Sequence, residues 1–309
     1  MWMKRLHQIL WIIVLGFCSV SIAAEGEWRR LFRGQVVLYC YEKELRHGDK
    51  IISIIDKALP VMSELFGLSR RPKITILVAP SQKIFDQITG GQIPEWGIAA
   101  AEPEQSVIFL KSPRIARPET DLKSVVLHEL SHVLLYTASG GYPIDRWFDE
   151  GLAMTFSEEK RFLETLTLAR AVFTGEIIKL DEIDDVLTFR RQKAGLAYQE
   201  SLSAVQFLID RFGGEALAGI IRKIGQNADM DTALQSAVGM GFGEFEDSWY
   251  QAMRTKYRWA IFLNFPFMIS VLMVVLFLVA FFVTRSRTEK RKKVWEQEDL
   301  NGFETSEDH

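Results

Sequence analysis

The chain has 309 residues and a formal net charge of −3, with 48% hydrophobic and 25% charged residues, which are ordinary values for a globular protein. The net charge is small, and basic residues form a block only at the flanks of a C-terminal apolar stretch. Both features argue against nucleic acid as a partner. Two cysteines are present, Cys18 and Cys40. If a leader containing the first is removed, no intrachain disulfide can form, and we expect Cys40 to be a buried, inert thiol.

The first 24 residues have the order of a secretory signal. Lys4 and Arg5 precede an apolar run over 9–20, and small residues end the segment at Ala24. This order predicts a signal peptide over 1–24 that is removed from the mature protein. An uncleaved N-terminal anchor is the alternative, although the apolar run is short for a membrane span.

A second apolar stretch, 260–283, contains no ionisable residue and would span about 36 Å as a helix, enough to cross a bilayer. Six basic residues follow it and three precede it, so we expect the tail at 284–309 to be cytoplasmic and the domain at 25–258 to be periplasmic or extracellular. We expect the tail from 294 onward to be disordered. The chain has no Asn-x-Ser/Thr acceptor, which favours a bacterial envelope slightly.

Strands come first in the domain at 25–258 and helices follow. This order predicts an α+β domain, with a small mixed β-sheet packed on a helical C-terminal half. We expect strands at 35–41, 73–79, 97–101 and 107–110, and helices at 49–65, 121–136, 146–157, 157–174, 197–212, 215–224, 230–238 and 242–258.

The pentapeptide HELSH at 128–132 is the most informative motif. Residues four apart share one face of a helix, so the imidazoles of His128 and His132 can approach one ion. Zinc suits them because it accepts imidazole nitrogen at about 2.0–2.1 Å. Glu129 projects about 100° around the helix, where it can take a proton from a water at the ion. The flanking residues are apolar, and in a buried helix these side chains are costly unless paired or metal-bound.

A catalytic zinc needs a third protein ligand and an open fourth position. The segment WFDEGLA lies downstream at 147–153, and its Glu150 follows His132 by 18 residues. A turn between two antiparallel helices would bring Glu150 back to the ion. Gly151 leaves room for a close helix contact, and Asp149 could orient a ligating histidine. We therefore predict Glu150 as the third zinc ligand.

HELSH followed by WFDEGLA resembles the gluzincins, the group that includes thermolysin and the zinc aminopeptidases, and the sequence is particularly similar to the bacterial peptidase MA-like domains. Two looser matches follow, YQESLS at 198–203 and GEFEDSW at 243–249. The resemblance spans roughly 122–249. It implies a zinc ion bound by His128, His132 and Glu150.

The resemblance also implies hydrolysis by a zinc-activated water, with Glu129 as the general base. Relatives place a tyrosine near Tyr198 that stabilises the oxyanion, with Tyr136 and Tyr142 as rivals in this chain. A strand upstream of the zinc helix, 97–101 or 107–110, would pair with extended substrate backbone. The Gly-Ala-Met-Glu-Asn segment of aminopeptidases is missing, so the choice between endopeptidase and exopeptidase stays open.

Together these features predict a membrane-anchored zinc-dependent peptidase that acts on a peptide or protein substrate in the cell envelope. One alternative is a non-catalytic gluzincin-like module for binding or assembly. Another is a zinc hydrolase of a non-peptide substrate, because the same ligand set serves several hydrolyses.

Overall fold

In a computed structural model of the chain, the structure describes residues 27–91, 93–94, 97–116, 121–157, 162–188, 191–257 and 265–304. The predicted signal peptide at 1–24 lies outside these residues. Two compact units are present. One comprises Met1–Ile144, Leu152–Glu159 and Gly214–Ala233, and the other Asp145–Gly151, Lys160–Gly213 and Leu234–His309.

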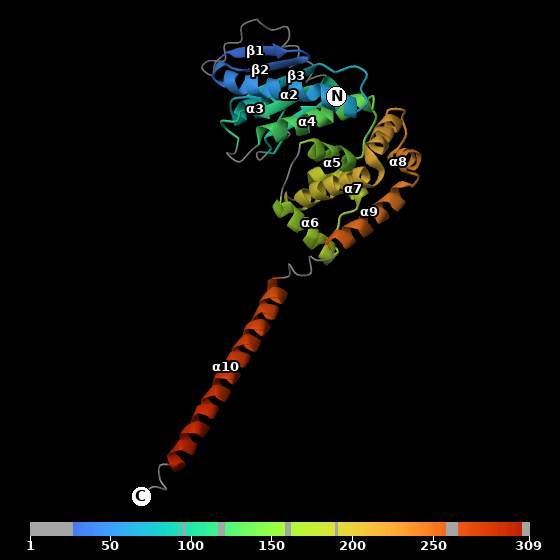
Figure 1. The fold of residues 1–309 in the computed structure, drawn as a ribbon. Helices are drawn as coiled ribbons and strands as arrows, with labels where there is room; N and C mark the ends of the chain where they lie inside the picture. The colour runs from blue at the N-terminus through green and yellow to red at the C-terminus, as the bar shows by residue number, and fades with distance from the viewer. Residues whose placement is uncertain are drawn as a thin grey trace. The chain divides into compact units, whose positions relative to one another are not determined.

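The first unit contains a five-stranded sheet (Figure 1), whose strands β1 to β5 span Trp28–Arg33, Val36–Tyr41, Ile74–Ala79, Ala99–Glu102 and Val107–Lys111. Their order in the sheet is β1-β2-β3-β5-β4. The inner strands β2, β3 and β5 run parallel, and both outer strands run antiparallel to their neighbours. This mixed sheet, with mostly helical chain after it, confirms the predicted α+β class.

Helices pack on the two faces of the sheet unequally. α2 (Leu45–Leu65) packs against β1 and β2, and α4 (Leu122–Ala138) packs beside it against β4 and β5. The opposite face receives α3 (Gln82–Ile88) over β3 and β5, where Phe85 and Phe109 belong to one buried cluster. Successive side chains of a strand point to opposite faces, and this alternation fills both layers of the core with apolar side chains.

Two short elements differ from the sequence-based expectation. β1 was not predicted, because its sequence WRRLFR carries three arginines and is almost wholly exposed. α3 was not predicted either, since a helix of seven residues shows little periodicity. The side chain of Ser81 caps it by accepting a hydrogen bond from the Ile84 N–H at 3.4 Å.

A buried carboxylate ties the ends of two parallel strands together. Glu44 follows β2, and its Oε2 accepts a hydrogen bond from the Ser112 hydroxyl, after β5, at 2.6 Å. The same oxygen lies 3.0 Å from Nδ1 of His47, and Oε1 lies 3.5 Å from Nε of Arg114.

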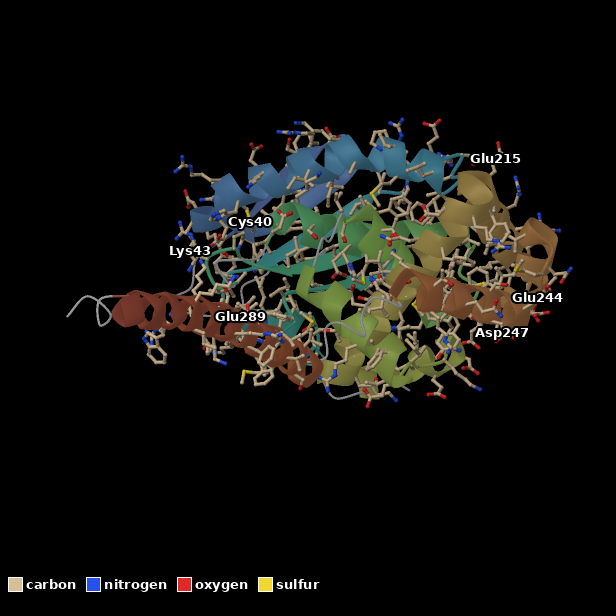
Figure 2. The ribbon with its side chains drawn as sticks, turned by 60° about the horizontal axis from the view of Figure 1, so that its bottom comes forward. Cys40, Lys43, Glu215, Glu244, Asp247 and Glu289 are labelled. Atoms are coloured by element: carbon tan, nitrogen blue, oxygen red, sulfur yellow. The ribbon has the colours of Figure 1, made fainter. Side chains whose placement is uncertain are left out.

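Cys40 is buried against α2 (Figure 2), and burial, followed by the charge of Glu44, raises its thiol pKa to about 11. The thiol is therefore buried and protonated, as expected.

The remaining helices confirm most of the predicted boundaries. These helices are α5 (Arg146–Phe156), α6 (Phe162–Thr174), α7 (Arg191–Ile224), α8 (Met230–Val238) and α9 (Phe242–Tyr257). The 3₁₀ segment η3 (Leu180–Thr188), between α6 and α7, was not predicted. Within α7, two helices meet at Gly213, whose φ of +80° breaks the helical backbone where the sequence predicted a break. Glu244 and Asp247 lie on the exposed side of α9 (Figure 2).

The last helix, α10 (Phe265–Glu304), contains one segment, Met268–Lys293, that is long and apolar enough to cross a membrane. The predicted span at 260–283 overlaps it, and its first five residues lie outside the described residues. The expectation of a disordered tail from 294 onward is wrong as far as Glu304, since α10 continues to that residue. Lys, Arg, Glu and Gln are good helix formers, which accounts for the continuation.

Candidate metal centre

α4 carries both histidines, and local signals define where this helix begins and ends. The side chain of Asp121 caps the start by accepting a hydrogen bond from the Lys123 N–H at 3.1 Å. Gly140 and Gly141, with φ of +66° and +81°, end the helix in a left-handed conformation that glycine adopts without strain. Nine of the 17 residues of α4 are buried, six of them apolar, so this helix is packed into the core of the first unit.

The helical spacing brings the two imidazoles together. The ring centroids of His128 and His132 lie 4.9 Å apart, with the ring planes at 78°. Both side chains are half-buried, so a ligand can reach them. Glu129, between them in sequence, is 9% exposed. The predicted zinc helix therefore has its two histidines on one face and its glutamate in a largely dry setting.

α5 carries the third residue and is anchored by an aromatic contact. Trp147 is fully buried and stacks on Phe245 of α9, with ring centroids 5.6 Å apart. The next residue of α9, Glu246, accepts a hydrogen bond from the Leu180 N–H at 2.7 Å. The motifs WFDEGLA and GEFEDSW therefore meet in the fold, and the second one supports the first.

Gly151 holds α5 close to α7. A Cβ at this position would meet the carbonyl oxygen of Ser201 and lie 2.6 Å from a methyl carbon of Val205. No residue other than glycine fits without a shift of the two helices. The close contact predicted for Gly151 is therefore confirmed, and it fixes the backbone next to Glu150.

Arg146 is a site residue that the sequence analysis did not identify. Its Nη2 lies 3.1 Å from Oε1 of Glu150, one helical turn away, and its backbone N–H donates to Oδ1 of Asp184 at 2.8 Å. Glu150 is only 4% exposed, and a neighbouring cation offsets the cost of burying its charge. Because a carboxylate has two oxygens, this ion pair is compatible with a metal ligand role. The four-residue spacing of Arg and Glu was the available signal.

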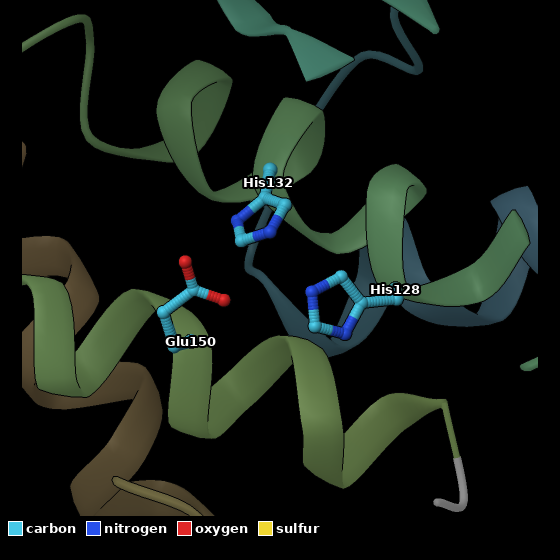
Figure 3. Close-up of side chains that lie close together, drawn as sticks. All are labelled: His128, His132 and Glu150. Atoms are coloured by element: carbon cyan, nitrogen blue, oxygen red, sulfur yellow. The ribbon is translucent and has the colours of Figure 1, made fainter. Parts of the chain in front are cut away.

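The ligand atoms of His128, His132 and Glu150 all lie within 4.8 Å of one another, and the three side chains point toward one another (Figure 3). Tetrahedral ligands of zinc at about 2.0–2.1 Å are about 3.4 Å apart, so small side-chain rotations suffice to bring this set onto one ion. Two imidazoles and one carboxylate leave a fourth position open. In the part of the chain that the structure describes, this is the one cluster of such side chains.

The tyrosines considered for the oxyanion differ in their surroundings. The hydroxyl of Tyr136 lies 3.0 Å from the point where a Cβ of Gly141 would be, so it packs on the loop after α4. Tyr142 lies in that loop and is 40% exposed. Tyr198 lies in α7 and is half-buried. The packing of Tyr136 disfavours it, and the role of Tyr198 stays a prediction.

Glu200, two residues after Tyr198, is a buried titratable group that the sequence analysis passed over. It is fully buried, and its Oε1 accepts a hydrogen bond from the Ile178 N–H at 3.2 Å. Burial raises its pKa to about 8, against smaller opposing effects of that hydrogen bond and of Lys193. Glu200 is therefore protonated at neutral pH. A glutamate within a helix gives no sequence signal of such burial.

The two strands considered for substrate pairing are not equivalent. β5 lies between β3 and β4, so its backbone is used on both sides and it is not available to a substrate. β4 ends the sheet, is half-buried, and packs beside α4. Of the two candidates at 97–101 and 107–110, the second is therefore wrong.

Comparison with known families bears on the whole arrangement. The family model of the peptidase MA superfamily matches residues 59–255, which is more than half of the chain. The chain belongs to the peptidase MA superfamily. The match begins well before the motifs at 128–132, so it includes β3, β4 and β5 of the sheet. No curated protein matches the chain.

Membership of the peptidase MA superfamily agrees with the geometry. Proteins of this superfamily are generally metal-dependent, and His128, His132 and Glu150 form a cluster that could hold a metal ion. The coarse function is therefore that of a metallopeptidase-like enzyme.

Proposed function

We propose that this peptidase MA protein is a membrane-anchored zinc-dependent peptidase that hydrolyses peptide bonds outside the cytoplasm. The observation that carries the proposal is the convergence of His128, His132 and Glu150 within 4.8 Å, from two helices. These residues would hold the ion. When bound, zinc would supply the Lewis acidity that makes a water molecule nucleophilic near neutral pH.

Glu129 is the proton carrier in this proposal. It adjoins His128 on α4, and its position about 100° around the helix keeps it beside the ligands and off the ion. Its carboxylate takes a proton from the attacking water and passes it to the leaving amine. Because Glu129 is only 9% exposed, water screens its charge little, and the carboxylate attracts a nearby proton more strongly.

Tyr198 is the proposed donor to the oxyanion that forms on the substrate carbonyl. A phenolic O–H aimed at developing negative charge stabilises the transition state more than the ground state. Half-burial of this side chain in α7 supports the role, because such a hydroxyl is accessible but partly dry.

β4 is the proposed docking edge for the substrate backbone. An extended peptide can add to the outer side of a terminal strand, with its main chain hydrogen-bonded in register. β4 (Ala99–Glu102) is that terminal strand and packs beside the histidine helix. Three consecutive alanines on it leave space for substrate side chains.

The proposed organisation places a signal peptide at 1–24, the peptidase domain at 25–258 and a membrane helix at 260–283 before a cytoplasmic tail at 284–309. Support comes from the apolar segment Met268–Lys293 of α10 and from the basic residues at its C-terminal end. The proposed location is a bacterial cell envelope.

The test is Glu129→Gln in the full chain. An isosteric amide keeps the ligand set but removes the basic oxygen, so zinc content and thermal stability should persist while peptide hydrolysis falls by about 10²–10⁴-fold. His132→Ala should instead abolish stoichiometric zinc, measured by elemental analysis. Glu244→Gln, an exposed change on α9, is the matched control and should alter neither property.

The outcomes separate the proposal from its alternatives. If Glu129→Gln rescued a deletion strain at normal protein level, the protein would act as a non-catalytic module. If a broad peptide library were untouched by zinc-loaded protein that still hydrolyses esters, the substrate class would be wrong. Full zinc content in His132→Ala would contradict the site itself.

A further inference from the structure

On one face of the sheet, the outer strand β1 is exposed among the described residues, whereas Val37 and Tyr39 of β2 are half-buried. α2 packs on β1 and β2 from one side, and α3 packs on the other side only over β3 and β5. On that other side, β1 presents Trp28, Arg30 and Phe32, which alternate with the residues facing α2. Phe32 is 79% exposed and Trp28 is 38% exposed. Two large aromatic side chains on an exposed strand face are costly in water.

A basic hollow adjoins this strand face. It has a volume of about 620 Å³ and is lined by Gln35, Ser69, Arg70, Arg71 and Lys73. The three cations are exposed. No ion pair of the described residues involves them, and none involves Arg30 of β1. A concentration of cations with no acidic partner attracts anions from solution.

The register of the sheet makes the hollow continuous with the aromatic strand. Val36 pairs with Ile74, and the Ile74 N–H donates to the carbonyl oxygen of Gln35 at 2.9 Å. Gln35 and Lys73 are therefore neighbours across β2 and β3. Val37, two residues after Gln35, pairs with Phe32. Alternation along the strands puts Trp28, Arg30, Phe32 and the flanking Lys73 on one face of the sheet. Arg70 and Arg71, in the loop before β3, line the hollow together with Lys73. We call these six residues the aromatic–basic face.

The charges of β1 are divided between its two sides. Arg29 and Arg33, which point to the α2 side, are ion-paired, with Glu42 at 3.0 Å and Asp49 at 3.0 Å. Arg30 points to the open side and has no such partner among the described residues. Among the cations of β1, Arg30 is therefore the one left to pair with an external anion.

We propose that the aromatic–basic face docks on the anionic lipid surface of the membrane in which α10 is anchored. Aromatic rings settle at the headgroup level, and arginine and lysine bind the phosphates of anionic lipids. Each cation near such a surface strengthens attachment about fivefold. This docking rests on the membrane anchoring proposed above and is independent of hydrolysis. It would restrain the first unit against the bilayer and limit the substrates that the site reaches.

The experiment uses the full chain in nanodiscs with brominated acyl chains, which quench tryptophan near the headgroups. The contribution of Trp28 is the difference between the parent protein and Trp28→Phe. We expect this contribution to be quenched in phosphatidylglycerol nanodiscs and unquenched in phosphatidylcholine nanodiscs. At about 1 M salt, where the screening length is about 3 Å, quenching should disappear.

Charge reversal separates specific docking from general attraction. The triple change Arg70→Glu, Arg71→Glu and Lys73→Glu should abolish Trp28 quenching in phosphatidylglycerol. The control reverses three exposed cations on the outer side of α2, which belongs to the same unit and receives the same change in net charge. That control should retain quenching; the three changes are Arg46→Glu, Lys50→Glu and Lys57→Glu.

Three results would overturn the docking. Incorporation of the chain with Trp28 unquenched in phosphatidylglycerol would reject the docking and leave the membrane anchor standing. Failure of the chain to incorporate into nanodiscs at all would reject the anchor and the docking together. A Trp28 emission that shifts to shorter wavelength with protein concentration in detergent would assign the face to a second copy of the chain.

Discussion

Replacement of Glu200 by Gln should stabilise the protein at alkaline pH. Glu200 is fully buried, and burial raises its pKa from the ordinary value of 4.5 to about 8. At 1.36 kcal/mol for each tenfold change in proton affinity, ionising this group inside the fold costs about 5 kcal/mol. Glutamine keeps an oxygen that accepts the hydrogen bond from the Ile178 N–H and cannot ionise.

The pH dependence follows from the direction of the shift. Since the pKa of Glu200 is higher in the folded than in the unfolded chain, the folded state holds an extra proton between pH 4.5 and about 8. The stability contribution of the protonated carboxyl is complete below pH 4.5 and is lost as the pH rises through about 8. Glu200→Gln should therefore match the parent near pH 4.5 and exceed it progressively toward pH 9.

The assay is thermal unfolding of the full chain in a neutral detergent, followed by near-ultraviolet circular dichroism between pH 4.5 and 9. The expected gain at pH 9 is about 2–5 kcal/mol, because local relaxation reduces the full ionisation cost. Glu215→Gln, an exposed change later in α7 (Figure 2), should have no pH-dependent effect. Equal melting temperatures of the parent and Glu200→Gln across this range would refute the reasoning.

Three further predictions concern the site and its attachment. Gly151→Ala should destabilise the folded protein by about 1–3 kcal/mol and weaken zinc binding in equilibrium dialysis, because α5 and α7 must separate to admit the added methyl group. Gly195→Ala, where an added Cβ meets no neighbour, should leave stability unchanged or raise it. Arg146→Gln should lower the melting temperature more in chelator than in zinc, because in chelator the buried Glu150 loses the Arg146 cation and gains no metal ion in its place. Equal losses in chelator and in zinc would contradict the role assigned to Arg146. An alkaline phosphatase fusion after Arg258 should be active and one after Lys293 inactive, and the reverse pattern would reject the proposed topology.

Sequence pattern alone was sufficient for features that depend on residues close together in the chain. The histidines of HELSH share a helix face because 3.6 residues per turn place positions four apart together, and their rings lie 4.9 Å apart. The inner strands were predicted from short runs rich in β-branched and aromatic residues, and prolines bound the run at 73–79. The apolar segment of α10 required only its length and composition.

Tertiary structure decided which distant residues meet. Glu150 was expected at the ion from its spacing, but its position depends on Gly151 packing against α7 and on the stacking of Trp147 with Phe245. Sheet order also decided that β4 is terminal and β5 interior, which strand composition does not reveal. Burial of Glu200 inside a polar-looking helix segment followed from the same packing. The periodicity of apolar residues is a property of a single helix or strand and can be read from its sequence. The contacts between distant residues depend on how several helices and strands pack together, and every packing partner contributes to that free energy.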